Sequence, residues 1–347
     1  MTNSDSGIYS FLDDYSEGCH AKILDALAAT NMCQQTAYGE DEYTAEAKSL
    51  IRHELGSQDI PVHLIATGTL ANIICIAACL RPHEAVIAAS SGHIVVRETG
   101  AIEATGHKII TLPPVNGKLT VQSIQSAVEA NAHFPHMAKP RLVYISNATE
   151  VGTIYTKAEL TAISEFCRNH KLLLFVDGAR LGAAIAADNN DLTLKDFAEL
   201  TDIFWIGGTK LGALLGEAIV IPDPVIAADF AFHIKQRGSL LAKGRILGLQ
   251  FRELFSAGLF HSLPKFANDM AAQLSRGIID AGYKLEAETE TNQVFPILPN
   301  EVIDSLNKSF AFYNWEKRGA DQSVIRLVTS WATDEAQVRK FVAQVQG

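Results

Sequence analysis

Two stretches of the chain share one design: LLLFVDGAR (172–180) and DIFWIGGTK (202–210) each run from apolar residues into glycine and charged side chains. A short apolar run bounded by turn residues predicts a buried strand. Similar runs occur elsewhere in the chain: VHLI (62–65), AVIAA (85–89), KIITL (108–112), RLVYIS (141–146) and EAIVIP (217–222). Helical patterns separate most of them, as in KAELTAISEFCRNH (157–170).

This alternation predicts an α/β fold. Strands buried on both faces and joined by helices form a mostly parallel, doubly wound sheet, which binds its ligand at the carboxyl ends of the strands. Near residue 224 the pattern changes to long helices, followed by VFPILP (294–299) and SVIRLVTSW (323–331). We therefore expect an N-terminal segment and a large domain in residues 1–223, and a small C-terminal α+β domain in residues 224–347.

The composition favours a small-molecule partner. With 48% hydrophobic residues, the 347-residue chain can bury a large core, and its net charge of −10 opposes a general role on nucleic acid or anionic membrane. The N-terminal MTNSDSGIYSF lacks the basic and apolar regions of a signal peptide, and we expect a cytoplasmic protein. Nothing in the sequence calls for a metal.

Asp177 and Lys210 directly follow the two quoted runs, so both should emerge at the ligand-binding rim. A desolvated lysine can form a Schiff base, and pyridoxal phosphate (PLP) needs a carboxylate that keeps its pyridine nitrogen protonated. Taken singly, Asp177 is more readily explained as a helix cap and Lys210 as a solvated loop lysine. Two charged groups after two apolar strands are costly to bury, and together they indicate a PLP site.

Two further segments end at the same rim. Gly68 and Thr69 in ATGTLAN (66–72) open an apolar helix, where free N–H groups favour a phosphate, although such a pair is also an ordinary cap. His93 could stack on a planar cofactor or accept a proton, with Glu98 orienting it, or it could be structural. The acidic segment 38–43 suits a helix N-terminus, and the basic run 233–245 suits a solvated helix face or an anion site.

As a set, the motifs resemble the low-specificity L-threonine aldolases, within the β-eliminating-lyase group of fold-type-I PLP enzymes. The resemblance spans nearly the whole chain. It is carried, in the family's order, by FLDDYSEGCH, YGEDEY, ATGTLAN, SSGHIVVRETGA, NATEVGTIY, FVDGARLG, IGGTKLGALLGEA, KQRGSLLAKGR and VIRLVTSWAT.

The resemblance implies a role for each matching residue. PLP would be held as a Schiff base on Lys210, with Asp177 on the pyridine nitrogen, His93 on the ring, and Gly68, Thr69 and Thr209 in the cofactor site. Arg180 and Arg326 would bind the substrate carboxylate, with Arg180 also close to the cofactor. In a homodimer or tetramer, Tyr38, Arg237 and Lys243, with neighbouring Lys235, would reach the partner subunit's cofactor and substrate.

The implied reaction is retro-aldol cleavage of L-threonine or L-allo-threonine to glycine and an aldehyde, with His93 as the base. A β-eliminating lyase or an aminotransferase would use the same cofactor machinery, and a PLP-binding protein without turnover is a non-enzymatic alternative. Two positions depart from the family: Leu211 follows Lys210, and Asp13 replaces a serine near the substrate carboxylate. We expect Asp13 to turn away from the substrate and pair with Arg326 or Arg180.

Overall fold

The computed structural model describes residues 7–347, and its centre is the predicted α/β sheet. Seven strands lie in the order β2-β8-β7-β6-β5-β3-β4. All neighbours are parallel except β8, which is antiparallel to both β2 and β7. The bounds are β2 (Val62–Ile65), β3 (Glu84–Ala89), β4 (Lys108–Leu112), β5 (Lys139–Ser146), β6 (Leu173–Asp177), β7 (Ile203–Gly207) and β8 (Glu217–Val220). Each predicted apolar run contains one of these strands, so the fold class is confirmed.

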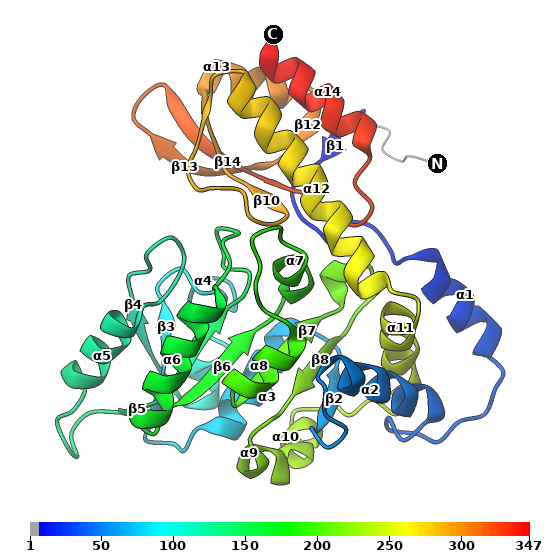
Figure 1. Cartoon of the computed structure of the whole chain (residues 1–347), viewed down its shortest axis with the longest axis vertical. Coiled ribbons are helices and arrows are strands. Elements are labelled where there is room, and N and C mark those ends of the chain that lie inside the picture. The colour runs from blue at the N-terminus through cyan, green and yellow to red at the C-terminus, as the bar shows by residue number, and fades with distance from the viewer. Residues whose placement is uncertain (1–6) are drawn as a thin grey trace.

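Both faces of the sheet are buried, because alternate residues of each strand belong to two separate cores. In β7, Phe204 and Ile206 pack into one core, whereas Ile203 and Trp205 pack into the other. Helices cover the two faces (Figure 1). They are α1 (Ala21–Thr30), α2 (Glu42–Glu54), α3 (Gly68–Cys79), α4 (His93–Val96), α5 (Val121–Ala130), α6 (Lys157–Asn169), α7 (Leu181–Ile185), α8 (Leu194–Leu200), α9 (Pro224–Ala228), α10 (Phe230–Gln236) and α11 (Arg245–Ser256), with short 3₁₀ turns η1 (Glu103–Thr105) and η2 (Thr209–Leu211).

A second, smaller sheet lies over one end of the first, and the long helix α12 connects the two regions (Figure 1). Its strands run β10-β14-β11-β9, with β13 on β14, while β1 pairs with β12 beside them. The elements are β1 (Tyr9–Ser10), α12 (Leu259–Asp280), β9 (Lys284–Leu285), β10 (Gln293–Val294), β11 (Pro296–Pro299), α13 (Asn300–Leu306), β12 (Phe310–Ala311), β13 (Tyr313–Arg318), β14 (Gln322–Val328) and α14 (Glu335–Gln346). Through β1, the N-terminal segment joins this C-terminal region.

Helices α10 and α11 pack against α3 and α2, beside the large sheet. The boundary between residues 223 and 224 stays a prediction. Within residues 7–347, no helix combines the length and apolarity needed to span a lipid bilayer.

Candidate active site

A cavity of about 840 Å³ opens at the carboxyl ends of the central strands. It brings together side chains from segments that are far apart in the sequence. Eight predicted site residues line it: Gly68, Thr69, His93, Asp177, Arg180, Thr209, Lys210 and Arg326. The doubly wound topology explains this meeting, because each residue follows a strand of the large sheet or, for Arg326, lies on β14 above it.

Three hydrogen bonds fix the orientation of the Asp177 carboxylate, which is only 3% exposed. Its Oδ2 accepts from the Tyr144 hydroxyl at 2.6 Å and the Asn72 amide at 3.0 Å, and its Oδ1 accepts from the Ala179 N–H at 3.0 Å. Arg180, not Asp177, is the N-cap of the following helix. Capping therefore does not account for a carboxylate that is buried at the edge of this cavity.

Lys210 lies in the turn after β7, opposite the acidic side chain of Glu217 on β8. Burial lowers the pKa of Lys210, and the charge of Arg180 adds to this effect. Burial also raises the pKa of Glu217 to about 8, against the opposing charge of Lys210. Glu217 accepts hydrogen bonds from the Thr209 hydroxyl and the Gly208 N–H, both at 3.0 Å. A lysine that loses its proton this readily is suited to nucleophilic attack on a carbonyl.

The segment around Gly68 leaves room for a phosphate. Thr67 caps α3 by accepting from the Leu70 N–H, and this end of the helix faces the cavity. A Cβ atom at Gly68 would lie 3.0 Å from the Trp205 ring, so a side chain here would disturb the wall. The positive end of a twelve-residue helix and a hydroxyl from Thr69 favour an anion at this position.

His93 is bound by a buried carboxylate. Its Nδ1 lies 2.7 Å from Glu98 Oε1, which also accepts from the Asn72 amide at 2.8 Å. Because a carboxylate accepts, Nδ1 carries the hydrogen and Nε2 is the ring nitrogen that can accept a proton. Glu98 thus orients His93 as expected, and Asn72 links this pair to Asp177.

Arg326 lines the cavity from β14. It stacks on Tyr313 and Trp315, at 4.7 and 5.2 Å from their ring centres, and donates to the Leu12 carbonyl at 3.3 Å. Its Nε is buried and has no hydrogen-bond partner within residues 7–347. Burial lowers the pKa of Arg326, and the nearby Arg180 lowers it further. A carboxylate bound between Arg180 and Arg326 would relieve this repulsion.

The expected partnership between Asp13 and these arginines is wrong, and the neighbouring Asp14 takes that place. Asp14 Oδ2 and Oδ1 accept from Arg180 Nε at 2.8 Å and Nη2 at 3.0 Å. Asp13 instead closes its own turn, accepting from the Tyr15 N–H and the Ser16 hydroxyl, and it does not line the cavity. Short aspartate side chains favour such local turns.

We predict that Asp14→Asn lowers the free energy of unfolding by about 3 kcal/mol, because it leaves the Arg180 charge without its buried partner. Burial alone would raise the pKa of Asp14, but Arg180 and Lys210 lower it overall. The contribution of Asp14 is therefore present above about pH 4 and is lost as the pH falls through its lowered pKa. Urea unfolding at several pH values measures this.

Asp13→Asn is the matched control, and its effect should stay within about 1 kcal/mol at every pH. An equal loss in both variants, or a loss in Asp14→Asn that persists in acid, would contradict the assignment of the buried pair.

Besides Asp13, three predicted residues lie outside the cavity in this single chain. Tyr38 is exposed, with Lys235 Nζ 4.9 Å from its ring centre, in a separate hollow between α2, α10 and α11. Arg237 bonds to His233 and Gln236, and Lys243 is exposed. They cannot serve this chain's own cavity from there, and their expected role toward a partner subunit stays a prediction.

Sequence reasoning gave no functional role to several residues that build the site. Asp14, Asn72, Glu150 and Glu217 all carry polar groups that are buried or line a cavity beside predicted site residues. Of these residues, only Glu217 could have been noticed in the sequence, because it is an acidic residue at the start of an otherwise apolar run. Asp14 could be found only by knowing which of two adjacent aspartates faces inward.

Comparisons with known proteins agree on one family. Residues 11–300 match the β-eliminating lyase family model. A low specificity L-threonine aldolase from a Pseudomonas strain is 34% identical over 343 residues, 96% of each chain, and one from Pseudomonas aeruginosa is 32% identical with the same coverage. The solved structure of a Leishmania major threonine aldolase has a TM-score of 0.96 and 48% identity, covering 97% of this chain and 98% of that one.

Proposed function

The chain belongs to the β-eliminating lyase family, and we propose that it is a PLP-dependent aldolase that cleaves L-threonine or L-allo-threonine to glycine and an aldehyde. The observation that carries the proposal is the meeting of Lys210 and Asp177 at one cavity, with the helix end at Gly68 beside them. Relatives named as threonine aldolases over nearly the whole chain support the substrate class.

The residues of the cavity fit PLP. Lys210 would hold its aldehyde carbon covalently, Asp177 its pyridine nitrogen, and the Gly68–Thr69 segment with Thr209 its phosphate. His93 would stack on its ring. When bound, PLP draws electrons from the bond that breaks at the substrate's Cα. The three hydrogen bonds on Asp177 fix that carboxylate in place before the cofactor arrives.

Substrate binding and the first proton transfer fall to other residues. Arg180 and Arg326, which both line the cavity, would hold the substrate carboxylate. The Nε2 atom of His93 would take the proton from the β-hydroxyl, directly or through water, while Glu98 holds the opposite nitrogen. Loss of that proton turns the hydroxyl into the carbonyl of the departing aldehyde.

A substrate panel tests the proposal. Purified, PLP-saturated protein should release an aldehyde from threonine, allo-threonine and phenylserine, because all three carry a β-hydroxyl and differ only in the configuration or the substituent of the β-carbon. Release of aldehyde from none of them would overturn the proposed activity.

We further propose that the active unit is at least a dimer. The basic segment that contains Lys235, Arg237 and Lys243 lies on the outer face with Tyr38, away from this chain's cavity. There it would complete the partner subunit's cofactor and substrate sites. We therefore expect sedimentation at assay concentration to find activity only in dimers or larger species. Fully active monomers would contradict this prediction.

A further inference from the structure

The proposed function leaves two carboxyl groups of the cavity without a role. Glu217 uses both of its oxygens to accept hydrogen bonds from Gly208 and Thr209, and the other group is Glu150. It follows β5, and its Oε1 accepts from the backbone N–H of His93 at 3.0 Å and from the Ser146 hydroxyl at 2.7 Å. Both bonds end on the same oxygen. Oε2 is therefore the oxygen that can meet a ligand in the cavity.

The surroundings of Glu150 favour its protonated form. Burial raises its pKa, and the Asp177 carboxylate raises it further, against the hydrogen bonds from Ser146 and His93. The phenols of Tyr144 and Tyr155 also lie within electrostatic reach. A carboxylic acid with a raised pKa keeps its proton to higher pH and can donate it to a carbon atom.

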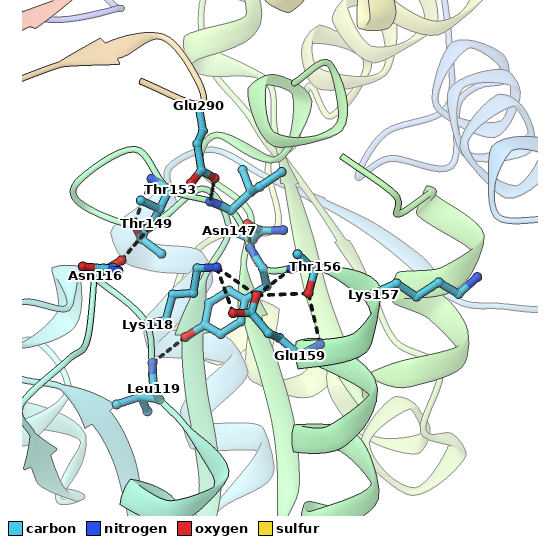
Figure 2. A network of polar contacts seen from close by, with 12 residues as sticks. Asn116, Lys118, Leu119, Asn147, Thr149, Thr153, Thr156, Lys157, Glu159 and Glu290 are labelled. Atoms are coloured by element: carbon cyan, nitrogen blue, oxygen red, sulfur yellow. Dashed lines mark hydrogen bonds and ion pairs between the residues drawn. The ribbon is translucent and has the colours of Figure 1, made fainter. Parts of the chain in front are cut away.

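The loop that carries Glu150 is held from three sides, as Figure 2 shows. Toward the 114–119 turn, the Thr153 hydroxyl donates to the Asn116 carbonyl at 2.7 Å, and the Leu119 N–H donates to the Tyr155 hydroxyl at 2.7 Å. Toward α6, Thr156 bonds to Glu159, which also pairs with Lys118.

The third support comes from the second sheet region, where Glu290 Oε2 accepts from the Ile154 N–H at 2.7 Å (Figure 2). The adjacent Thr291 donates to the Gly152 carbonyl at 2.7 Å. Contacts from two separate parts of the fold thus fix residues 152–156, which follow Glu150. Proton transfer needs such fixed placement, because small displacements of the donor slow the reaction steeply.

The proposed reaction requires two proton transfers. One proton leaves the β-hydroxyl as the Cα–Cβ bond breaks, and His93 is assigned to it. A second proton must be added to Cα before glycine can leave, and no residue has yet been assigned to supply it.

We infer that Glu150 is the catalytic acid that supplies the proton to Cα of the glycine product. Its O–H bond breaks as the Cα–H bond forms, which leaves a carboxylate beside the imidazolium of His93. The proton that His93 took from the β-hydroxyl then passes to Glu150, directly or through water, and both groups return to their starting forms. No oxidant, reductant or further reactant is needed.

The inference rests on the proposed function, and exchange of the α-hydrogens of glycine isolates the step it concerns. Full-length, PLP-loaded protein is incubated with glycine in deuterated water, and exchange is followed by NMR. No aldehyde is involved, so failure of this step is distinguishable from failure of the aldolase activity. We expect Glu150→Gln to slow exchange about a hundredfold, and Glu150→Asp to restore part of the rate. Exchange at the wild-type rate in Glu150→Gln would overturn the inference.

Glu290→Gln is the matched control, because it weakens the hold on the same loop without removing an acid from the cavity. It should change glycine exchange and single-turnover aldehyde release by the same factor, whereas Glu150→Gln should slow exchange more than release. If Glu150→Gln, like Glu290→Gln, slows glycine exchange and aldehyde release by the same factor, Glu150 only shapes the loop and the inference fails.

Infrared difference spectroscopy gives a reading that is independent of turnover. In PLP-loaded protein without substrate, we expect wild type to show a protonated-carboxyl band that persists to higher pH than that of an ordinary glutamate and that Glu150→Gln lacks. The band of Glu217 should be present in both proteins. Identical carboxyl bands in the two proteins would contradict the inference.

Discussion

We expect Lys210→Ala to abolish turnover and to prevent the covalent attachment of PLP. Lys210 is the lysine that lines the cavity of about 840 Å³, and burial and Arg180 lower its pKa so that the free amine is available. Without that amine, borohydride treatment followed by mass spectrometry should find no cofactor fixed to the chain. The loss of turnover should be complete within the limits of the assay.

Lys195→Ala is the control, because Lys195 is an exposed lysine on α8 that pairs only with Glu199 at 3.7 Å. That variant should keep both the reducible adduct and the activity. A cofactor that is still fixed by borohydride at an equivalent site in Lys210→Ala would show that another lysine carries it.

Asp177→Asn should lower kcat/KM by roughly three orders of magnitude while some PLP binding remains. An amide cannot keep the pyridine nitrogen protonated, so most of the electron withdrawal is lost, equivalent to about 4 kcal/mol of activation free energy. Amide and carboxylate have nearly the same shape, and the contacts of Asp177 with Tyr144 and Ala179 limit the rearrangement. Steady-state kinetics at saturating PLP measure the change.

Tyr144→Phe provides the comparison for Asp177. It removes the 2.6 Å hydrogen bond to Oδ2 but keeps the carboxylate charge, so its effect should be far smaller. A near-native rate in Asp177→Asn would mean that the carboxylate is structural and that the cofactor is bound in another way.

The fold was predictable because the central strands of the large sheet are buried on both faces, which makes them continuous apolar runs. β13 was missed for the opposite reason: it is largely exposed, so its sequence YNWEKR carries no strand pattern. Its position depends on pairing with β14 rather than on its own side chains. Local pattern therefore identified the large sheet but not the whole of the small one.

The site was predictable where topology alone sets a residue's position, as for Asp177 and Lys210 at the ends of neighbouring strands. The prediction was wrong at the Asp13-Asp14 pair. Only the packing of the N-terminal segment over the cavity decides which of the two side chains contacts Arg180. Glu150 was missed because its placement depends on a contact that the local pattern does not show, the hydrogen bond from the backbone N–H of His93, 57 positions away.

A product balance with L-threonine tests the central claim most directly. Purified, PLP-saturated protein is incubated with the amino acid, and every product is quantified. We predict that glycine and acetaldehyde appear in equal amounts as threonine disappears. Formation of a 2-oxo acid with ammonia, or conversion of the cofactor to pyridoxamine phosphate without release of aldehyde, would contradict retro-aldol cleavage.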